Sequence, residues 1–164
     1  MENMNDTLKV LLVDDDSFVH EMVQLLVGGT EFSLVSAENV SEAMRIIAND
    51  TPDIIITDAM MPGESGFSLI SKVKSNPRTQ DIPIILWTIM EDAEGSVMDA
   101  SGRADILANK PIYLSDIISS LKKAKELVEE RSVRRTFPQP RWSADIKDGA
   151  LPVSVPYQTF DRVM

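Results

Sequence analysis

The sequence lacks cysteine, contains a single histidine, and has no apolar run that approaches the length of a membrane-spanning helix. The absence of cysteine excludes disulfide bonds and thiolate chemistry. A lone histidine on a predicted helix, as His20 is, is typical of a surface or packing residue rather than of a reactive group. The N-terminal MENMNDTLK is polar and has no signal-peptide pattern. We therefore expect a cytoplasmic protein with no membrane span.

Positive charge is scarce in most of the chain. Residues 1–130 hold 10 Lys and Arg against 23 Asp and Glu, a net charge of −13, whereas residues 131–164 hold 6 against 3, a net charge of +3. Nucleic-acid binding depends on cationic contacts to phosphate, so the acidic part argues against a direct nucleic-acid partner. An acidic surface suits a protein that binds a divalent cation, although it also serves solubility alone.

The apolar pattern alternates between strand-like runs and amphipathic helical stretches. Strands are predicted over residues 8–13, 32–37, 53–57, 82–88 and 104–108, and helices over 17–28, 41–50, 67–75, 91–102 and 114–130. Alternation of this kind predicts an α/β fold, a doubly wound five-stranded parallel sheet with helices on both faces. The unbroken Val, Ile and Leu runs are what strands buried on both faces require.

The last predicted helix carries Ile117, Leu121, Ala124 and Val128 on one face, a spacing that favours a core-facing stripe over a coiled coil of fewer than two heptads. Beyond it, four of the nine prolines fall in a stretch without sustained apolar periodicity. We predict one domain over residues 1–130 and a proline-containing basic tail or linker over residues 131–164.

The stretch KVLLVDDDSF places three aspartates at the end of a buried strand. Two carboxylates about 4 Å apart repel by roughly 4 kcal/mol at an effective dielectric near 20, so something must compensate. A solvated turn with a helix cap at Asp16 or Ser17 explains one of these residues. It leaves Asp14 and Asp15 without a role.

Other strands end in reactive groups at the same edge of the predicted sheet. Asp58 ends the third strand, Thr88 the fourth, and Lys110 follows the fifth. In a doubly wound sheet, ligands bind beyond the carboxyl ends of the strands. Three carboxylates with few other ligands favour Mg²⁺ over Zn²⁺. A metal beside a carboxylate nucleophile, a hydroxyl and an ammonium group suit the binding and transfer of a phosphoryl group.

The motifs VLLVDDD, IIITDAMMPGESG, ILWT and NKP, in this order and spacing, resemble those of response-regulator receiver domains of bacterial two-component signalling. The resemblance covers residues 7 to about 128. It implies a flavodoxin-like sheet in the order 2-1-3-4-5, with Asp58 as the phosphoacceptor. The resemblance also implies that Mg²⁺ is bound by Asp14, Asp15, Asp58 and the backbone carbonyl of Met60. Thr88 and Lys110 would contact the phosphoryl group. The Lys110–Pro111 bond would be cis.

Some positions depart from the family pattern. Ile89 stands where a small residue usually leaves room for the phosphoryl group, and Leu107 stands at the switch position that is often aromatic. Met60 and Met90 replace side chains that can be polar and place water in relatives that hydrolyse the phosphate quickly. We therefore predict slow phosphorylation, a long-lived product and no aromatic switch at residue 107.

The sequence is compatible with three classes of function. The first is a phosphorylatable receiver that is no enzyme beyond accepting and losing its own phosphoryl group. The second is a pseudo-receiver that acts as an interaction module independent of phosphorylation. The third, an aspartate-nucleophile phosphatase, is disfavoured because Met60 replaces its second aspartate. For the first class, the expected partners are a sensor histidine kinase or phosphotransfer protein, a downstream protein effector, and a second copy bound through the last helix and strand.

Overall fold

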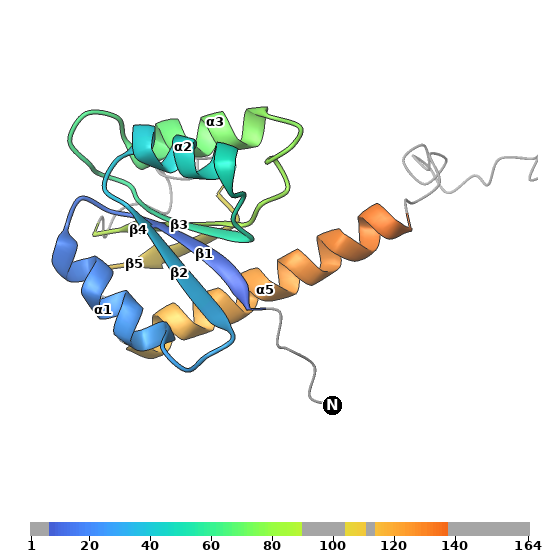
Figure 1. The fold of residues 1–164 in the computed structure, drawn as a ribbon, viewed down its shortest axis with the longest axis horizontal. Coiled ribbons are helices and arrows are strands. Elements are labelled where there is room, and N and C mark those ends of the chain that lie inside the picture. The colour runs from blue at the N-terminus through green and yellow to red at the C-terminus, as the bar shows by residue number, and fades with distance from the viewer. Residues whose placement is uncertain (1–6, 90–103, 111–113, 138–164) are drawn as a thin grey trace, which may run out of the picture.

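The structure is a computed structural model that describes residues 7–89, 104–110 and 114–137. Five parallel strands form one sheet in the order β2-β1-β3-β4-β5 (Figure 1). The strands are β1 (Leu8–Val13), β2 (Phe32–Ala37), β3 (Ile54–Asp58), β4 (Ile84–Thr88) and β5 (Ile106–Asn109). The helices are α1 (Ser17–Val27), α2 (Val40–Asn49), α3 (Gly66–Ser75) and α5 (Leu114–Thr136). The predicted fold class and strand order are confirmed, whereas the helix predicted over residues 91–102 lies outside the described part.

Helices cover both faces of the sheet, α2 and α3 on one and α1 and α5 on the other (Figure 1). Each face has its own apolar core, and successive side chains of β1 point alternately into the two cores. Val10 and Leu12 belong to the cluster under α1 and α5, and Leu11 and Val13 to the cluster under α2 and α3. All four side chains are fully buried, as the uninterrupted apolar run predicts.

Asp16 starts α1 as its N-cap. Its carboxylate accepts a hydrogen bond from the backbone N–H of Phe18 at 2.9 Å, which satisfies one of the donors that a helix start leaves unpaired. The cap is therefore Asp16 rather than Ser17, and it accounts for one of the three consecutive aspartates. Among the described helices, none is both long enough and apolar enough to cross a membrane.

The predicted stripe on α5 is confirmed as core. Ile117, Leu121 and Ala124 are buried in the cluster under α1 and α5, and Val128 packs against it. The predicted end of the helix at residue 130 is wrong, because α5 continues to Thr136 and the first residues assigned to the tail are helical. Apolar periodicity does not reveal this last part, since charged contacts hold it. The predicted tail over residues 138–164 lies outside the described part.

A cluster of five charged residues joins the C-terminal part of α5 to the N-terminal edge of the sheet. Arg131 pairs with Asp105, just before β5, and donates a hydrogen bond to the backbone carbonyl of Asp81 at 2.7 Å. Arg135 pairs with the Asp81 carboxylate at 2.9 Å. Asp105 also accepts a hydrogen bond from Lys74 of α3 at 2.8 Å. We call Lys74, Asp81, Asp105, Arg131 and Arg135 the basal cluster.

Candidate functional site

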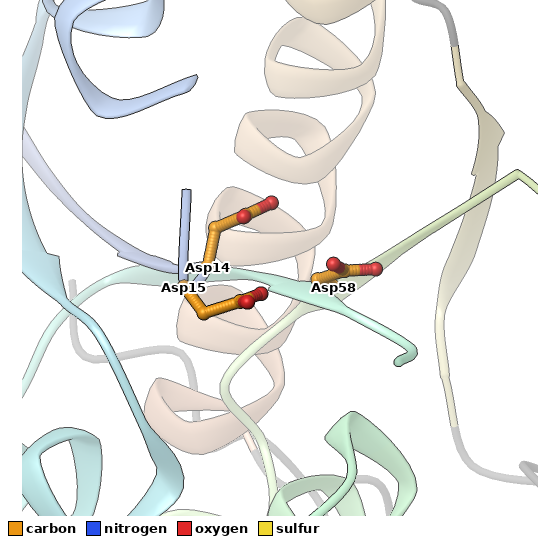
Figure 2. A group of neighbouring side chains, drawn as sticks. All are labelled: Asp14, Asp15 and Asp58. Carbon is orange, nitrogen blue, oxygen red and sulfur yellow. The ribbon is translucent and has the colours of Figure 1, made fainter. Parts of the chain in front are cut away.

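Asp14, Asp15 and Asp58 meet at the carboxyl edge of the sheet (Figure 2). Asp14 and Asp15 directly follow β1 and Asp58 ends β3, and these two strands are neighbours in the sheet. One carboxylate oxygen from each lies within 4.8 Å of the others, close enough for the three to bind one ion. Asp14 is buried and Asp15 is exposed, so an ion held here would keep water on its outer side. The donor set fits Mg²⁺, as the sequence predicts.

The Lys110 ammonium group lies between two of these carboxylates. Its Nζ atom is 2.7 Å from Asp14 Oδ2 and 3.2 Å from Asp58 Oδ2. The residue is placed there by the end of β5, where its backbone N–H donates to the carbonyl of Thr88 at 2.7 Å. Lys110 therefore offsets part of the repulsion among the aspartates and points at Asp58.

Burial and charge act in opposite directions on this pair. Burial raises the pKa of Asp58 above its ordinary value, and it outweighs the lowering caused by Lys110 and by the hydrogen bond from the backbone N–H of Met60. Burial alone would lower the pKa of Lys110, but its hydrogen bond with Asp14 and the charges of Asp14 and Asp58 leave that pKa raised. Lys110 is thus firmly cationic at neutral pH and can attract an anionic group to Asp58.

Asp14 is held in place by its backbone and its side chain. Its Oδ1 accepts a hydrogen bond from the backbone N–H of Asp16 at 2.9 Å, while Oδ2 faces Lys110. The His20 ring contacts the carbonyl oxygen of Asp14 at 2.6 Å through Nε2, which donates because a carbonyl can only accept. The interpretation of His20 as a surface or packing residue missed this contact with the site. The only sequence signal for it is the position of His20 one turn into the helix that follows Asp14.

The loop after β3 returns tightly to the end of that strand. The backbone N–H of Met60 donates to Asp58 Oδ1 at 3.3 Å, and the N–H of Gly66 donates to the carbonyl of Ala59 at 3.1 Å. A Cβ atom on Gly66 would lie 2.0 Å from the backbone oxygen of Asp58. Glycine at the start of α3 is therefore a requirement of this close approach. Gly63, with φ +82°, supplies the left-handed turn in the same loop.

The site and the fold match one known family. The model of the response regulator receiver domain matches residues 10–122. The chain belongs to this family. It is 31% identical over 113 residues to the phosphate regulon transcriptional regulatory protein PhoB of Pseudomonas aeruginosa, a match that covers 69% of this chain and 49% of PhoB. It is also 29% identical over 125 residues to the response regulator PleD of Caulobacter vibrioides, covering 74% of this chain and 28% of PleD.

Solved structures agree on the receiver fold. The chemotaxis response regulator CheY4 of Vibrio cholerae superimposes with a TM-score of 0.67 at 24% identity, covering 72% of this chain and 98% of CheY4. Like the strand order, this likeness supports the flavodoxin-like arrangement. The chain spans about half or less of the length of these two relatives, PhoB and PleD.

The residues that depart from the receiver pattern lie in different environments. Ile89 is 69% exposed and Met60 is 62% exposed, so neither side chain belongs to the core. Leu107 is half-buried and packs against the apolar cluster under α2 and α3. Thr88 is buried at the end of β4, beside Asn109 in the register of β4 and β5. Met90 and Pro111 lie outside the described residues, as does the predicted cis bond.

Proposed function

We propose that this receiver domain accepts a phosphoryl group on Asp58 and signals through the resulting change in its contacts with other proteins. The observation that carries the proposal is the position of Lys110, whose ammonium group contacts Asp58, one of three carboxylates that can share one ion. Asp58 is half-buried and has Met60 N–H on one oxygen and Lys110 on the other. Its carboxylate is thereby oriented for attack.

In the proposed reaction, a carboxylate oxygen of Asp58 forms a bond to phosphorus while the bond between phosphorus and the donor breaks. The leaving group of the donor takes the electron pair of the broken bond. Mg²⁺, when bound by Asp14, Asp15, Asp58 and the carbonyl of Met60, supplies positive charge to the phosphoryl oxygens. Lys110 binds one of these oxygens as a point charge, and the Thr88 hydroxyl binds another.

The proposed partners follow from this chemistry. A sensor histidine kinase or a phosphotransfer protein would donate the phosphoryl group, and a protein effector or a second copy of the chain would respond to it. No chemistry beyond gaining and losing this group is proposed for the domain. The relatives PhoB, a transcriptional regulatory protein, and PleD, a response regulator, support a role in signalling.

Intact-mass measurement after incubation with acetyl phosphate and Mg²⁺ tests the proposal. We expect one phosphoryl group per chain, none in Asp58→Asn, and none when the metal is removed with a chelator. Asp15→Asn should lose most of the Mg²⁺ affinity, because it removes one carboxylate from the set of three. Asp16→Asn is the matched control, since asparagine caps a helix as well as aspartate does. An unlabelled wild-type chain, or labelling that persists in Asp58→Asn, would contradict the proposal and favour a pseudo-receiver or another acceptor.

A further inference from the structure

Trp87 places a large aromatic ring directly beside the proposed phosphorylation site. It is the residue before Thr88 in β4, and its indole is 2% exposed. The Lys110 Nζ atom lies 5.0 Å from the centroid of the ring, within the range of a cation–π interaction. Among the described residues, the buried Nε1–H of Trp87 has no hydrogen-bond partner. The ring is therefore oriented by Lys110 and by apolar contacts, without a hydrogen bond.

Trp87 belongs to β4, which lies between β3, the strand that ends in Asp58, and β5, the strand that precedes Lys110. In the register of the sheet, Trp87 lies opposite Asp58 on one side and Ala108 on the other. Its carbonyl also accepts a hydrogen bond from the N–H of Ala59 at 2.9 Å. Trp87 is thus close to both ends of the Asp58–Lys110 ion pair. A change in the charge or position of Asp58 or Lys110 therefore alters the immediate surroundings of the indole.

The side chain of Trp87 points into the core under α1 and α5, where it belongs to the same cluster as Ile117 of α5. A void of about 10 Å³ lies there, lined by Ile56, Ile85, Trp87, Ala108, Ile117 and Ser120. Because no hydrogen bond fixes Nε1 and this small void lies beside the ring, the indole can make a small adjustment of its position. Leu107, at the switch position of the family, instead packs against the cluster on the opposite face of the sheet.

We propose that Trp87 is a positioning residue for Lys110 and that its indole transmits the phosphorylation state of Asp58 to α5. This inference rests on the proposed function. The negative face of the indole attracts the ammonium group and limits its position to the space between Asp14 and Asp58. A phosphoryl group on Asp58 would attract Lys110 and change its position over the ring. The ring would then shift against Ile117, at the start of α5.

Two substitutions separate the aromatic face from simple volume. Trp87→Phe keeps a ring under Lys110, whereas Trp87→Leu keeps an apolar side chain and removes the ring. We expect the rate of Asp58 labelling by acetyl phosphate to fall about three- to tenfold in Trp87→Leu and less than about twofold in Trp87→Phe. The loss should appear as a higher acetyl phosphate concentration at half-maximal rate, because Lys110 binds the phosphoryl group. Ile85→Val, which enlarges the same void without touching Lys110, controls for lost core volume.

The native residue provides a second measurement that does not depend on a core substitution. In a Trp142→Phe background, Trp87 is the only tryptophan of the chain. We expect its fluorescence to change on labelling of Asp58, and amide hydrogen exchange around Ile117 to change with it. The exchange response should persist in Trp87→Phe and be lost in Trp87→Leu.

Each outcome decides between the two proposals. Equal labelling kinetics in wild type, Trp87→Phe and Trp87→Leu would overturn the positioning role while leaving the proposed function intact. Unchanged fluorescence on full labelling would overturn the transmission to α5, even if Trp87→Leu does not fold. A wild-type chain that takes up no phosphoryl group would refute the proposed function, and the role of Trp87 would fail with it.

Discussion

The substitution Gly66→Ala tests how closely α3 must approach Asp58, the proposed phosphoacceptor. The added Cβ would lie 2.0 Å from the backbone oxygen of Asp58, 2.9 Å from its carbonyl carbon and 3.0 Å from Thr57 Oγ1. Cβ atoms essentially never approach other heavy atoms closer than 3.0 Å. Because the nearest atoms belong to the backbone, a rotamer change cannot relieve the clash. Either the start of α3 or the end of β3 must move by about 1 Å, the difference between 2.0 and 3.0 Å.

The expected cost follows from this displacement. Overpacking a buried position destabilises a protein by about 1–3 kcal/mol, and the better helix propensity of alanine returns up to about 1 kcal/mol. With a urea m-value of about 1–2 kcal/mol/M, a net loss of about 1–2 kcal/mol lowers the unfolding midpoint by about 0.5–2 M. The effect on chemistry should be larger, because a 1 Å misplacement of a reacting group can reduce its rate about 100-fold.

Urea unfolding and the labelling of Asp58 by acetyl phosphate measure the two effects separately. Gly63→Ala is the matched control, because Gly63 has φ +82° and no atom within 4 Å of its added Cβ. It should lose about 1 kcal/mol through backbone strain and keep the labelling rate of the wild type. If Gly66→Ala retains both the stability and the labelling rate of the wild type, the close contact does not constrain the site and the reasoning fails.

Three further predictions concern access and charge. Ile89→Ala should speed the labelling of Asp58 by removing the exposed side chain that follows Thr88, and equal rates in the two proteins would exclude Ile89 as a gate. The pKa of Asp58 is raised in the folded protein, so its contribution to stability is most favourable below pH 3.8, where the carboxyl is protonated in both the folded and the unfolded protein. That contribution is lost as the pH rises through the pKa of Asp58 in the folded protein and the buried carboxyl ionises. Asp58→Asn should therefore raise the thermal unfolding midpoint at pH 7 and much less at pH 3, and an equal change at both would contradict this. The pKa of Asp105 is lowered because its hydrogen bonds with Lys74 and Arg131 outweigh burial, so its contribution is present above pH 3.8 and lost as pH falls through the folded pKa. Asp105→Asn should cost about 3 kcal/mol in urea unfolding at pH 7 by leaving two cations without their carboxylate, and a cost that persists in full at pH 2 would refute this origin.

Most of the fold could be predicted because its signals are local or periodic. Alternating strand-like and helical patterns identify the sheet, and the motifs at the strand ends place Asp14, Asp58 and Lys110 at one edge. The end of α5 could not be predicted in this way. Arg131 is held by Asp105, which is distant in the sequence, and no apolar period marks such a contact.

Other features of the site depend on distances that a sequence does not contain. Trp87 could be assigned to the core from its strand, but its contact with Lys110 depends on how β4 and β5 align. Gly66 could be assigned to a turn, but the 2.0 Å approach to Asp58 depends on where α3 enters the domain. The arrangement of neighbouring elements, rather than the type of residue, determines both features.

The basal cluster limits how α5 can move as a lever. At 1.5 Å per residue, the 23 residues of this helix extend about 35 Å, so a rotation of about 5° about one end displaces the other by roughly 3 Å. Arg131 and Arg135 bind the far part of the helix to Asp105 and Asp81. A rotation of α5 must therefore either break these ion pairs or take the start of β5 and the segment before β4 with it. The ion pairs at the N-terminal edge of the sheet, opposite to the edge that holds Asp58, therefore limit how far α5 can rotate.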